Sequence, residues 1–519
     1  MPSQITHTNR LELGLHLLVF AVAALVLTLK SHGAYNDDDL DHYFMAAASL
    51  REPLFLVDYW GRAGFTTLYA LPAQFGWTAT RLFTLGLVVL TGFVTARTAA
   101  RLGARQPAIW AALAIWQPLV LLLSFSVLTE PFAALLIAIV LNRQANDRPV
   151  EAALAAGLLP TVRLELGIVS CLVAAWILLR HRRHWPLLPL MALPFFLWAT
   201  IGAVVHGAPL WLLNEIRAAG RPLATAGPVH YLRNLIVVTG PVVFVGLGLG
   251  AWNLATRGPI RPLFAGLTWI VVFSLLTLLT WDKLQFGASI GFLRHLIVLS
   301  PAAALLAGAG FERALGETNK RDRWIVAGVV IGVTTVVGLV LSHRLQYDFL
   351  VVPGHDWRRL MTLVPAALLL LVVPWLPRGR RAALSALPII AAVSCLLITR
   401  PIDLNREQLV VQRSVEFVKA KGLMDRPLYV SHPWFYLFAD LDRWDRTRTQ
   451  YTQRAAIAKA KPGSIVVWEN HYSWRLFGDI MVAELRDNPA WRLIREFEAD
   501  DRRFRVVIFE RVGPEPDRR

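Results

Sequence analysis

Four aspartates crowd a short polar segment that follows the first long apolar run of the chain. They are Asp37, Asp38, Asp39 and Asp41, and His42 comes next. Because carboxylates held this close repel one another, at least one of them should have a raised pKa. A carboxylate with a raised pKa can act as a general base toward a hydroxyl group near neutral pH. An acidic first turn that stabilises the following helix through its dipole explains the same pattern, so both interpretations stay open.

A second group of charges, Arg163 and Glu165, lies in a turn between two apolar runs. Charges are costly in lipid, so these side chains should face protein or a water-filled cavity. They could bind each other, or Arg163 could bind a phosphate or an acidic catalytic residue. The residues alone do not separate a structural ion pair from a binding site.

Basic residues recur in two further polar segments. One holds Lys283, with Arg294 and His295 at the start of the next apolar run, and the other holds His355 and Arg358. Cationic side chains at a membrane interface suit a lipid-linked phosphate or diphosphate, although snorkelling to lipid headgroups explains any single residue equally well. One acidic segment and several basic segments on the same face indicate an acid/base centre beside a phosphate site.

Other chemical signatures are missing from the sequence. The aspartate run could bind a divalent cation through oxygen ligands, but its spacing is not diagnostic. Two cysteines, Cys171 and Cys395, lie inside apolar runs, which excludes a disulfide framework. The sequence holds no P-loop, dinucleotide-binding glycine pattern, zinc-ligand spacing or nucleophile elbow. We therefore expect neither a metal nor another cofactor.

Long apolar runs must position these polar segments. Of the 519 residues, 55% are hydrophobic and only 17% are charged, whereas about a quarter are charged in a soluble protein. The charges gather between runs that are long enough to cross a bilayer, which predicts an α-helical polytopic membrane protein. Basic cytoplasmic loops explain the net charge of +17, so we expect membrane lipid and no nucleic acid as a partner.

We expect about 13 transmembrane helices within residues 1–400, the first of them a retained helix rather than a signal peptide. Short arginine-rich loops alternate with longer mixed loops, which places the N-terminus inside and the acidic segment outside. The expected cores are 11–30, 78–96, 107–124, 127–142, 150–161, 164–180, 186–205, 234–254, 263–281, 292–310, 324–342, 360–376 and 382–399.

The composition changes near residue 400. Residues 401–519 are dense in charge and contain no run of membrane-spanning length. Short β-branched and aromatic runs alternate with helical patterns, which predicts a small soluble α/β domain on the extracytoplasmic side. The expected strands are Pro427–Val430, Ser464–Trp468, Trp491–Phe497 and Phe504–Phe509.

Taken in order, these features resemble the GT-C superfamily of polytopic membrane glycosyltransferases. The resemblance extends over essentially the whole chain and rests on three short motifs: Asn36–Tyr43 after the first span, the turn Thr161–Gly167 and the helix start Gly291–Pro301. The turn looks like the Thr-Arg-Pro-Glu-Gly turn of these proteins, with Leu164 in place of proline. The helix start looks like their Arg-Tyr-x-Leu-x-x-x-Pro motif, with His295 in place of tyrosine.

The resemblance implies an inverting glycosyltransferase. Such enzymes move a sugar from a polyprenyl- or dolichyl-phosphate carrier to a glycan or lipid acceptor, on the extracytoplasmic face of a membrane. Mannose or another hexose is the preferred sugar, glucose, arabinose and an amino sugar are the alternatives, and the chemistry usually needs no metal. A bacterial inner or plasma membrane is the expected location.

The resemblance also implies roles for single residues. Asp39 and Asp38 match the general base best, with Asp37 and Asp41 as alternatives. The other candidates would contact substrate: Arg163 and Glu165 would orient the loop or substrate, and cations would hold the donor phosphate. The expected substrate-binding residues are Asp37, Asp41, His42, Arg163, Glu165, Lys283, Arg294, His295, His355 and Arg358.

Three other functions would use a similar chain. A lipid transporter or flippase would place charged or broken helices at the middle of the bilayer and would show a repeat between its halves, and we find neither. A non-catalytic subunit would use the tail to bind a partner. A ligase for diphosphate-linked glycans would need an Arg and His pair in a large outside loop, for which His355 and Arg358 are candidates.

Overall fold

The chain divides into two compact units. The computed structural model describes residues 7–219, 228–256, 260–280, 291–316, 323–332, 343–346, 350–353, 368, 371–372, 380–476 and 479–513. Met1–Lys30 and Met45–Pro401 form one unit, which we call the membrane unit. Ser31–Phe44 and Ile402–Arg519 form the other, which we call the tail unit. The sequence predicted a single module over 1–400, so the grouping of the acidic segment with the tail differs from that expectation.

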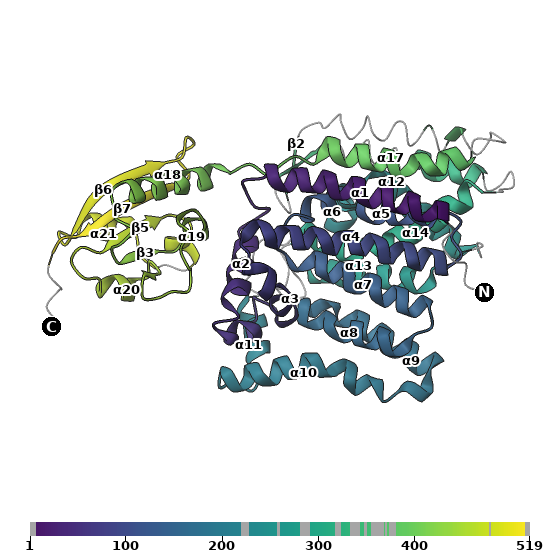
Figure 1. Cartoon of the computed structure of the whole chain (residues 1–519), viewed down its shortest axis with the longest axis horizontal. Coiled ribbons are helices and arrows are strands. Elements are labelled where there is room, and N and C mark those ends of the chain that lie inside the picture. The colour runs from purple at the N-terminus through teal and green to yellow at the C-terminus, as the bar shows by residue number, and fades with distance from the viewer. Residues whose placement is uncertain are drawn as a thin grey trace. The chain divides into compact units, whose positions relative to one another are not determined.

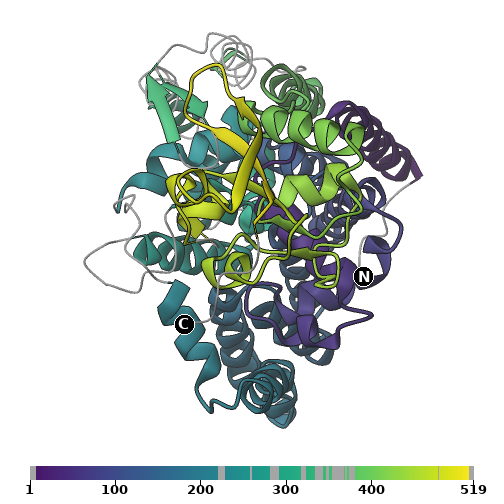
Figure 2. The same ribbon diagram turned by 90° about the vertical axis from the view of Figure 1, so that its left-hand side faces the viewer.

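The membrane unit is built of helices, and Figure 2 looks along the axes of many of them. Short 3-10 turns join some of these helices, at Pro53–Val57 (η1), Leu164–Leu166 (η2), Arg182–His184 (η3) and Leu293–Leu299 (η5). A two-stranded antiparallel hairpin pairs β1 (His343–Gln346) with β2 (Leu350–Pro353). The helices are α1 (His7–Lys30), α3 (Ala63–Ala73), α4 (Trp77–Arg101), α5 (Pro107–Ile115), α6 (Pro118–Leu123), α7 (Thr129–Ala145), α8 (Pro149–Val162), α9 (Gly167–Arg180), α10 (Leu187–Val205), α11 (Trp211–Ala219), α12 (His230–Ala255), α13 (Leu263–Leu279), α14 (Ser300–Ala314) and α17 (Arg380–Ile398).

The helices confirm a polytopic α-helical architecture but not the number of 13 spans. Within the described ranges, five helical segments are long and apolar enough to cross a membrane: Arg10–Lys30, Trp77–Arg101, Arg182–Val205, His230–Ala255 and Leu293–Ala314. Several shorter apolar helices accompany them, at Pro149–Val162, Leu263–Leu279, Arg323–Gly332 and Ala382–Ile398. Most of the expected core 360–376 lies outside the described residues.

One expected span is broken into two helices. The predicted core 107–124 consists of α5 and α6, which Trp116 and Gln117 separate. Gln117 has an extended backbone, with φ −113° and ψ 135°, because the ring of Pro118 disfavours a helical conformation in the residue before it. Hydrophobic length therefore identified the run correctly, while the proline determined where the helix ends.

Small residues let α12 and α14 approach each other closely. Gly246 and Gly250 stand four residues apart on α12, and the face that they form meets Leu306 and Ala307 of α14. A Cβ atom on Gly250 would lie 2.5 Å from the backbone oxygen of Leu306. Helices that pack in lipid commonly use this spacing of small residues, because van der Waals contact replaces the hydrophobic effect as the attraction. This close pair fixes α14, which directly follows the polar turn η5.

The part of the tail unit from Ile402 on is a small α/β domain, drawn in yellow-green and yellow in Figure 1. Its five-stranded sheet has the order β4-β3-β5-β7-β6, in which β3 pairs parallel with β4 and β5, and β7 pairs antiparallel with β5 and β6. The sheet confirms the predicted strands, and β4 is an addition too short for a sequence pattern. The elements are α18 (Arg406–Ala420), β3 (Leu428–Val430), α19 (Pro433–Ala439), β4 (Thr449–Gln450), α20 (Arg454–Ala458), β5 (Ile465–Glu469), η7 (Tyr472–Leu476), α21 (Val482–Arg486), β6 (Trp491–Glu498) and β7 (Arg505–Arg511).

The helix α2 (Asp38–Ala48) links the two units along the chain. Its first residues, up to Phe44, belong to the tail unit, and the rest belong to the membrane unit. Asp38, Asp39 and Asp41 form its acidic first turn. These carboxylates therefore lie at the N-terminus of a helix, where their negative charge stabilises the positive end of the helix dipole.

We predict that Gly250→Val destabilises the membrane unit, because the added side chain meets the backbone of α14. Overpacking of this kind costs about 1–3 kcal/mol. The matched control is Gly86→Val on α4, where a Cβ atom meets nothing within 4 Å. Thermal unfolding of the purified protein in detergent should show a lower midpoint for Gly250→Val alone. Equal midpoints for the two variants would contradict the close packing of α12 and α14.

Candidate active site

A buried carboxylate, Glu130, lies in the first turn of α7, and 1% of its surface is exposed. The helix dipole favours a negative charge at this position. That contribution is small beside the cost of removing a carboxylate from water, so Glu130 needs cationic partners.

Two arginines and a histidine from two other segments lie around Glu130. Arg163, which caps the C-terminal end of α8, donates a hydrogen bond to Oε1 of Glu130. Nε of Arg294 lies 3.3 Å from the same oxygen, and Nε2 of His295 lies 3.8 Å from it. Arg294 also lies over the ring of Phe292, at 4.3 Å from the ring centroid. Segments far apart in sequence thus meet at one carboxylate oxygen.

Arg163 bridges two carboxylates. Its Nε donates to Oε1 of Glu165 at 2.6 Å, while its Nη1 binds Glu130. The ion pair with Glu165 that the sequence left open is therefore present, and Arg163 also binds a second carboxylate. Leu164, which replaces the proline of the resembled turn, begins the 3-10 turn η2 that carries Glu165.

The sequence pattern indicates Arg163, Glu165, Arg294 and His295 as site residues but not Glu130. The structure brings the predicted four together around the missed one. Glu130 was overlooked because it stands alone in an apolar run, although a single charge inside such a run is itself a functional signal in a membrane protein. Two carboxylates and two guanidiniums form a network that holds its cations in fixed places. Guanidiniums held in this way suit an anionic phosphate group.

The acidic segment lies in the tail unit and is anchored there at two points. Oδ1 of Asp37 accepts a hydrogen bond from Nε1 of Trp434 at 2.8 Å, and Oδ2 accepts one from the hydroxyl of Tyr472 at 2.5 Å. Asp41 forms a salt bridge with the guanidinium of Arg443. These contacts join the start of α2 to residues that lie about 400 positions later in the chain.

The remaining candidates in this segment are also held locally. Oδ2 of Asp39 accepts the backbone N–H of Tyr35 at 2.8 Å, and Asp39 has 1% of its surface exposed. Oδ2 of Asp38 accepts from Nδ2 of Asn36 at 3.2 Å. His42 is buried. The assignment of a catalytic role to Asp38 or Asp39 stays a prediction.

Burial changes the pKa values of groups in this segment. Burial raises the pKa of Asp41 and outweighs the opposing effect of Arg443, and the charges of Asp38 and Asp37 raise it further. The prediction of a raised carboxylate pKa is confirmed for Asp41, with burial rather than repulsion as the main cause. Burial and the charge of Asp37 also raise the pKa of Tyr472, so its hydroxyl remains a donor.

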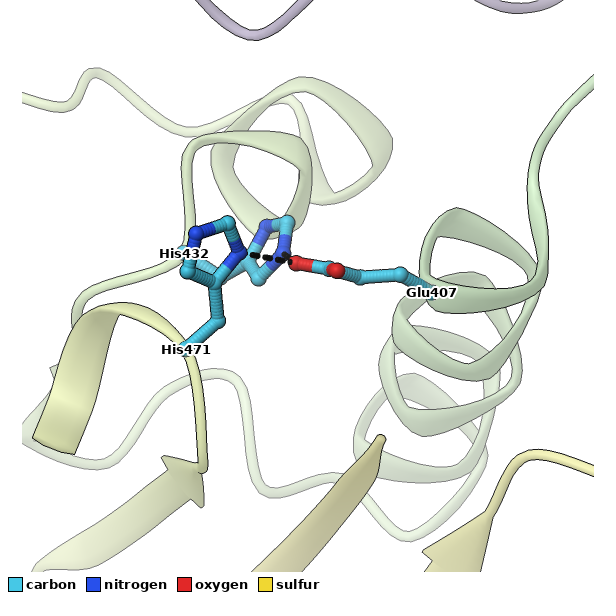
Figure 3. A group of neighbouring side chains, drawn as sticks. All are labelled: Glu407, His432 and His471. Atoms are coloured by element: carbon cyan, nitrogen blue, oxygen red, sulfur yellow. Dashed lines mark hydrogen bonds and ion pairs between the residues drawn. The ribbon is translucent and has the colours of Figure 1, made fainter. Parts of the chain in front are cut away.

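A second polar cluster of the tail unit, shown in Figure 3, contains Glu407, His432 and His471. Oε1 of Glu407 lies 2.8 Å from Nε2 of His432 and 2.6 Å from Nδ1 of His471. Two imidazoles and a carboxylate are ligands that zinc accepts. However, Nδ1 of His432 accepts the backbone N–H of Trp434 at 3.2 Å, so the ring proton lies on Nε2 and leaves no lone pair there for a metal. The contacts fit a hydrogen-bonded cluster, and independence from metal stays a prediction.

Three predicted binding residues, Lys283, His355 and Arg358, lie outside the described residues. Their roles therefore remain predictions from the sequence.

We predict that Glu130→Ala destabilises the membrane unit strongly, because it leaves Arg163 and Arg294 without their shared carboxylate. Breaking a buried pair in this way costs about 3–5 kcal/mol. The control is Glu151→Ala, which removes a half-exposed pair with Arg143 and should cost at most about 1 kcal/mol. Thermal unfolding in detergent measures both. A small and equal loss in the two variants would show that Glu130 is not held by these cations.

We also predict that the cluster of Figure 3 makes stability depend on pH. Although burial opposes both shifts, the hydrogen bonds and charges lower the pKa of Glu407 to about 2 and raise the pKa of His471 above its usual value of 6.5. The contribution of Glu407 is present above pH 4.5 and is lost as the pH falls toward 2. The contribution of His471 is present below pH 6.5 and is lost as the pH rises through its elevated pKa.

The stability difference between the wild-type protein and Glu407→Gln should therefore be largest between pH 4.5 and 6.5. Thermal midpoints measured for both proteins from pH 4 to 9 test this expectation. A difference that stays constant over the whole range would mean that the cluster carries no ion pair.

Comparisons with known proteins address the fold. No protein-family model matches the sequence, and no curated protein is significantly similar to it. Two solved structures of ArnT from Cupriavidus metallidurans are similar in fold. The apo structure has a TM-score of 0.62 at 14% identity and covers 96% of this chain and 98% of its own. The structure bound to undecaprenyl phosphate has a TM-score of 0.63 at 15% identity, and the match covers 98% of this chain and 100% of the ArnT chain.

A third solved structure, the arabinofuranosyltransferase AftD from Mycobacteria, matches at 16% identity over 96% of this chain and 40% of its own. Its TM-score of 0.45 is too low to support a shared fold. The likeness to ArnT spans nearly the whole of both chains, including the apolar helices and the small sheet that follows them. The chain is accordingly an integral membrane protein that has the fold of ArnT over nearly its whole length.

Proposed function

We propose that the protein is an inverting glycosyltransferase that takes a sugar from a polyprenyl phosphate. The observation that carries the proposal is the buried cluster in which Arg163, Arg294 and His295 surround Glu130. Arg294 is buried and the side chain of Arg163 is 11% exposed, and guanidiniums held with so little water around them commonly serve a function in a membrane protein. The GT-C fold supports glycosyl transfer as that use.

The cationic cluster would bind the phosphate of the donor and stabilise it as the leaving group. Negative charge on the phosphate grows as the glycosidic bond breaks, and preorganised cations lower the energy of that transition state. The carboxylates of Glu130 and Glu165 hold the guanidiniums in place before the donor arrives. One ArnT structure contains undecaprenyl phosphate, which supports a carrier of the same chemical class here.

The general base of this reaction is Asp39, with Asp38 as the alternative. The base removes a proton from the acceptor hydroxyl while the oxygen attacks the anomeric carbon. The bond to the phosphate oxygen breaks on the opposite face, which inverts the configuration. The assignment is supported by the motif Asn36–Tyr43 and by the partners of Asp37 and Asp41 in the tail unit, which give those two carboxylates an anchoring role.

We further propose mannose or another hexose as the sugar and a glycan or glycolipid as the acceptor. The sequence resemblance to mannosyltransferase-like branches supports this choice. The reaction would take place on the extracytoplasmic face of a bacterial inner or plasma membrane, because the arginine-rich loops are those expected inside.

We expect purified protein in lipid to transfer label from radiolabelled polyprenyl-phosphate mannose, or another polyprenyl-phosphate sugar, to a glycolipid extract. Asp39→Asn or Asp38→Asn should lower turnover about 10²- to 10⁴-fold, the usual contribution of a general base. The matched control is Asp425→Asn, which changes an exposed aspartate of the tail unit. If no lipid-linked sugar is turned over and the protein instead moves lipid between leaflets, it is a transporter.

A further inference from the structure

We propose that Glu407, together with His432 and His471, positions the acidic segment by holding the two donors that bind Asp37. The cluster would act as a brace that fixes the first turn of α2, where the proposed base lies. The inference rests on the proposed function for its effect on catalysis, but its effect on the acidic segment can be measured without any substrate.

The two histidines of the cluster stand next to the two donors. His471 directly precedes Tyr472, whose hydroxyl donates to Oδ2 of Asp37. His432 lies two residues before Trp434, whose indole N–H donates to Oδ1. Because Oε1 of Glu407 contacts both imidazoles, this one oxygen restrains both donors of Asp37 at once.

Further hydrogen bonds make each of these two segments rigid. The buried carboxylate of Glu469 accepts the backbone N–H groups of His471, Tyr472 and Ser473 at 2.7, 2.8 and 2.7 Å. Nδ1 of His432 accepts the backbone N–H of Trp434 at 3.2 Å. A movement of either imidazole is therefore passed to the donor one or two residues away along the backbone.

The charges around His471 strengthen the brace. His471 contacts Glu407, which lies on α18. The carboxylates of Glu469 and Asp37 also act on His471 electrostatically. The rings of Tyr472 and His432 lie at 4.4 and 6.4 Å from its own ring. This acidic surrounding favours a protonated imidazole, which makes a stronger hydrogen bond to Glu407 than a neutral one does.

Loss of the brace should loosen the acidic segment without unfolding the tail unit. Asp41 remains tied to Arg443 by a salt bridge that does not involve Glu407. The hydrophobic core of the sheet, which includes Trp468, Trp491 and Phe509, contains none of the three polar side chains. The expected defect is thus local, at the Asp37 end of the segment.

The first test is hydrogen exchange of the full-length protein in lipid, read on peptides that cover residues 31–44. Glu407→Ala should speed their exchange about tenfold to a hundredfold, as expected when charge-assisted hydrogen bonds worth about 1.5–3 kcal/mol are lost. Glu407→Gln keeps an acceptor oxygen and should restore part of the protection. Unchanged exchange in Glu407→Ala overturns the proposal.

Two further variants separate positioning from a general loss of folding. Tyr472→Phe removes only the hydroxyl that donates to Asp37 and should speed exchange of the same peptides while the cluster stays intact. Glu510→Ala is the matched control, because Glu510 also binds two cationic side chains of the tail unit, Arg426 and Arg492. It should leave residues 31–44 unchanged, and an equal effect of Glu510→Ala would overturn the proposal.

The second test is the transfer assay with the same variants. Glu407→Ala should lower kcat about tenfold or more and leave KM for the donor nearly unchanged, because the brace fixes the base and does not contact the donor phosphate. Glu407→Gln should recover part of kcat. A change in KM alone, or an equal loss of kcat in Glu407→Ala and Glu407→Gln, would overturn a positioning role.

The outcomes distinguish this inference from the proposed function. If the wild-type protein transfers no sugar, the proposed function fails, while hydrogen exchange still decides whether the brace exists. If the wild-type protein is active and Glu407→Ala behaves like it in both assays, the brace fails alone. One bound zinc ion for each chain, found by elemental analysis and lost in Glu407→Ala and His432→Ala, would replace the hydrogen bonds with a metal and overturn the proposal.

Discussion

A charge removed from water must meet an opposite charge, and this requirement shapes the polar centre of the membrane unit. Glu130 is buried among apolar helices, so it binds Arg163 and stands close to Arg294 and His295. The segments that supply these partners are the end of α8 and the turn η5. Helix packing sets their positions: α8 packs against α7, and the glycine contacts bring α12 against α14, which follows η5. Apolar packing therefore aligns the charges, and the charges in turn hold the turns between helices.

The same requirement acts in the tail unit with a different outcome. Asp37 binds the indole of Trp434 and the hydroxyl of Tyr472, and Asp41 binds the guanidinium of Arg443. These contacts make the acidic segment part of the tail unit, although it lies about 400 residues earlier in the chain. A segment of only 14 residues, Ser31–Phe44, leaves the membrane unit and returns to it along the chain. The tail thus controls the backbone that carries the proposed base. This gives a physical role to a domain that the sequence alone described only as soluble and α/β.

The charged residues have two kinds of role: some are fixed by their partners, and others are proposed to act on the substrates. Cations around Glu130 suit a donor phosphate, and carboxylates at the start of α2 suit the activation of an acceptor hydroxyl. In each place some charged residues are fixed by partners, as Asp37, Asp41 and Arg163 are. Residues fixed in this way can position a reactive neighbour at no further entropic cost when substrate binds.

The sequence by itself determined the helical membrane architecture, the boundary near residue 400 and the short strands of the tail, because each depends on local hydrophobic length or alternation. It also identified Arg163, Glu165, Arg294 and His295, because charges beside apolar runs stand out. Only the tertiary structure revealed Glu130 as the common partner of Arg163, Arg294 and His295, and the cluster of Glu407 with two histidines. These features join residues tens to hundreds of positions apart, and such contacts leave no period or spacing in one sequence. The three-dimensional packing of the helices and of the sheet decides which distant charges meet.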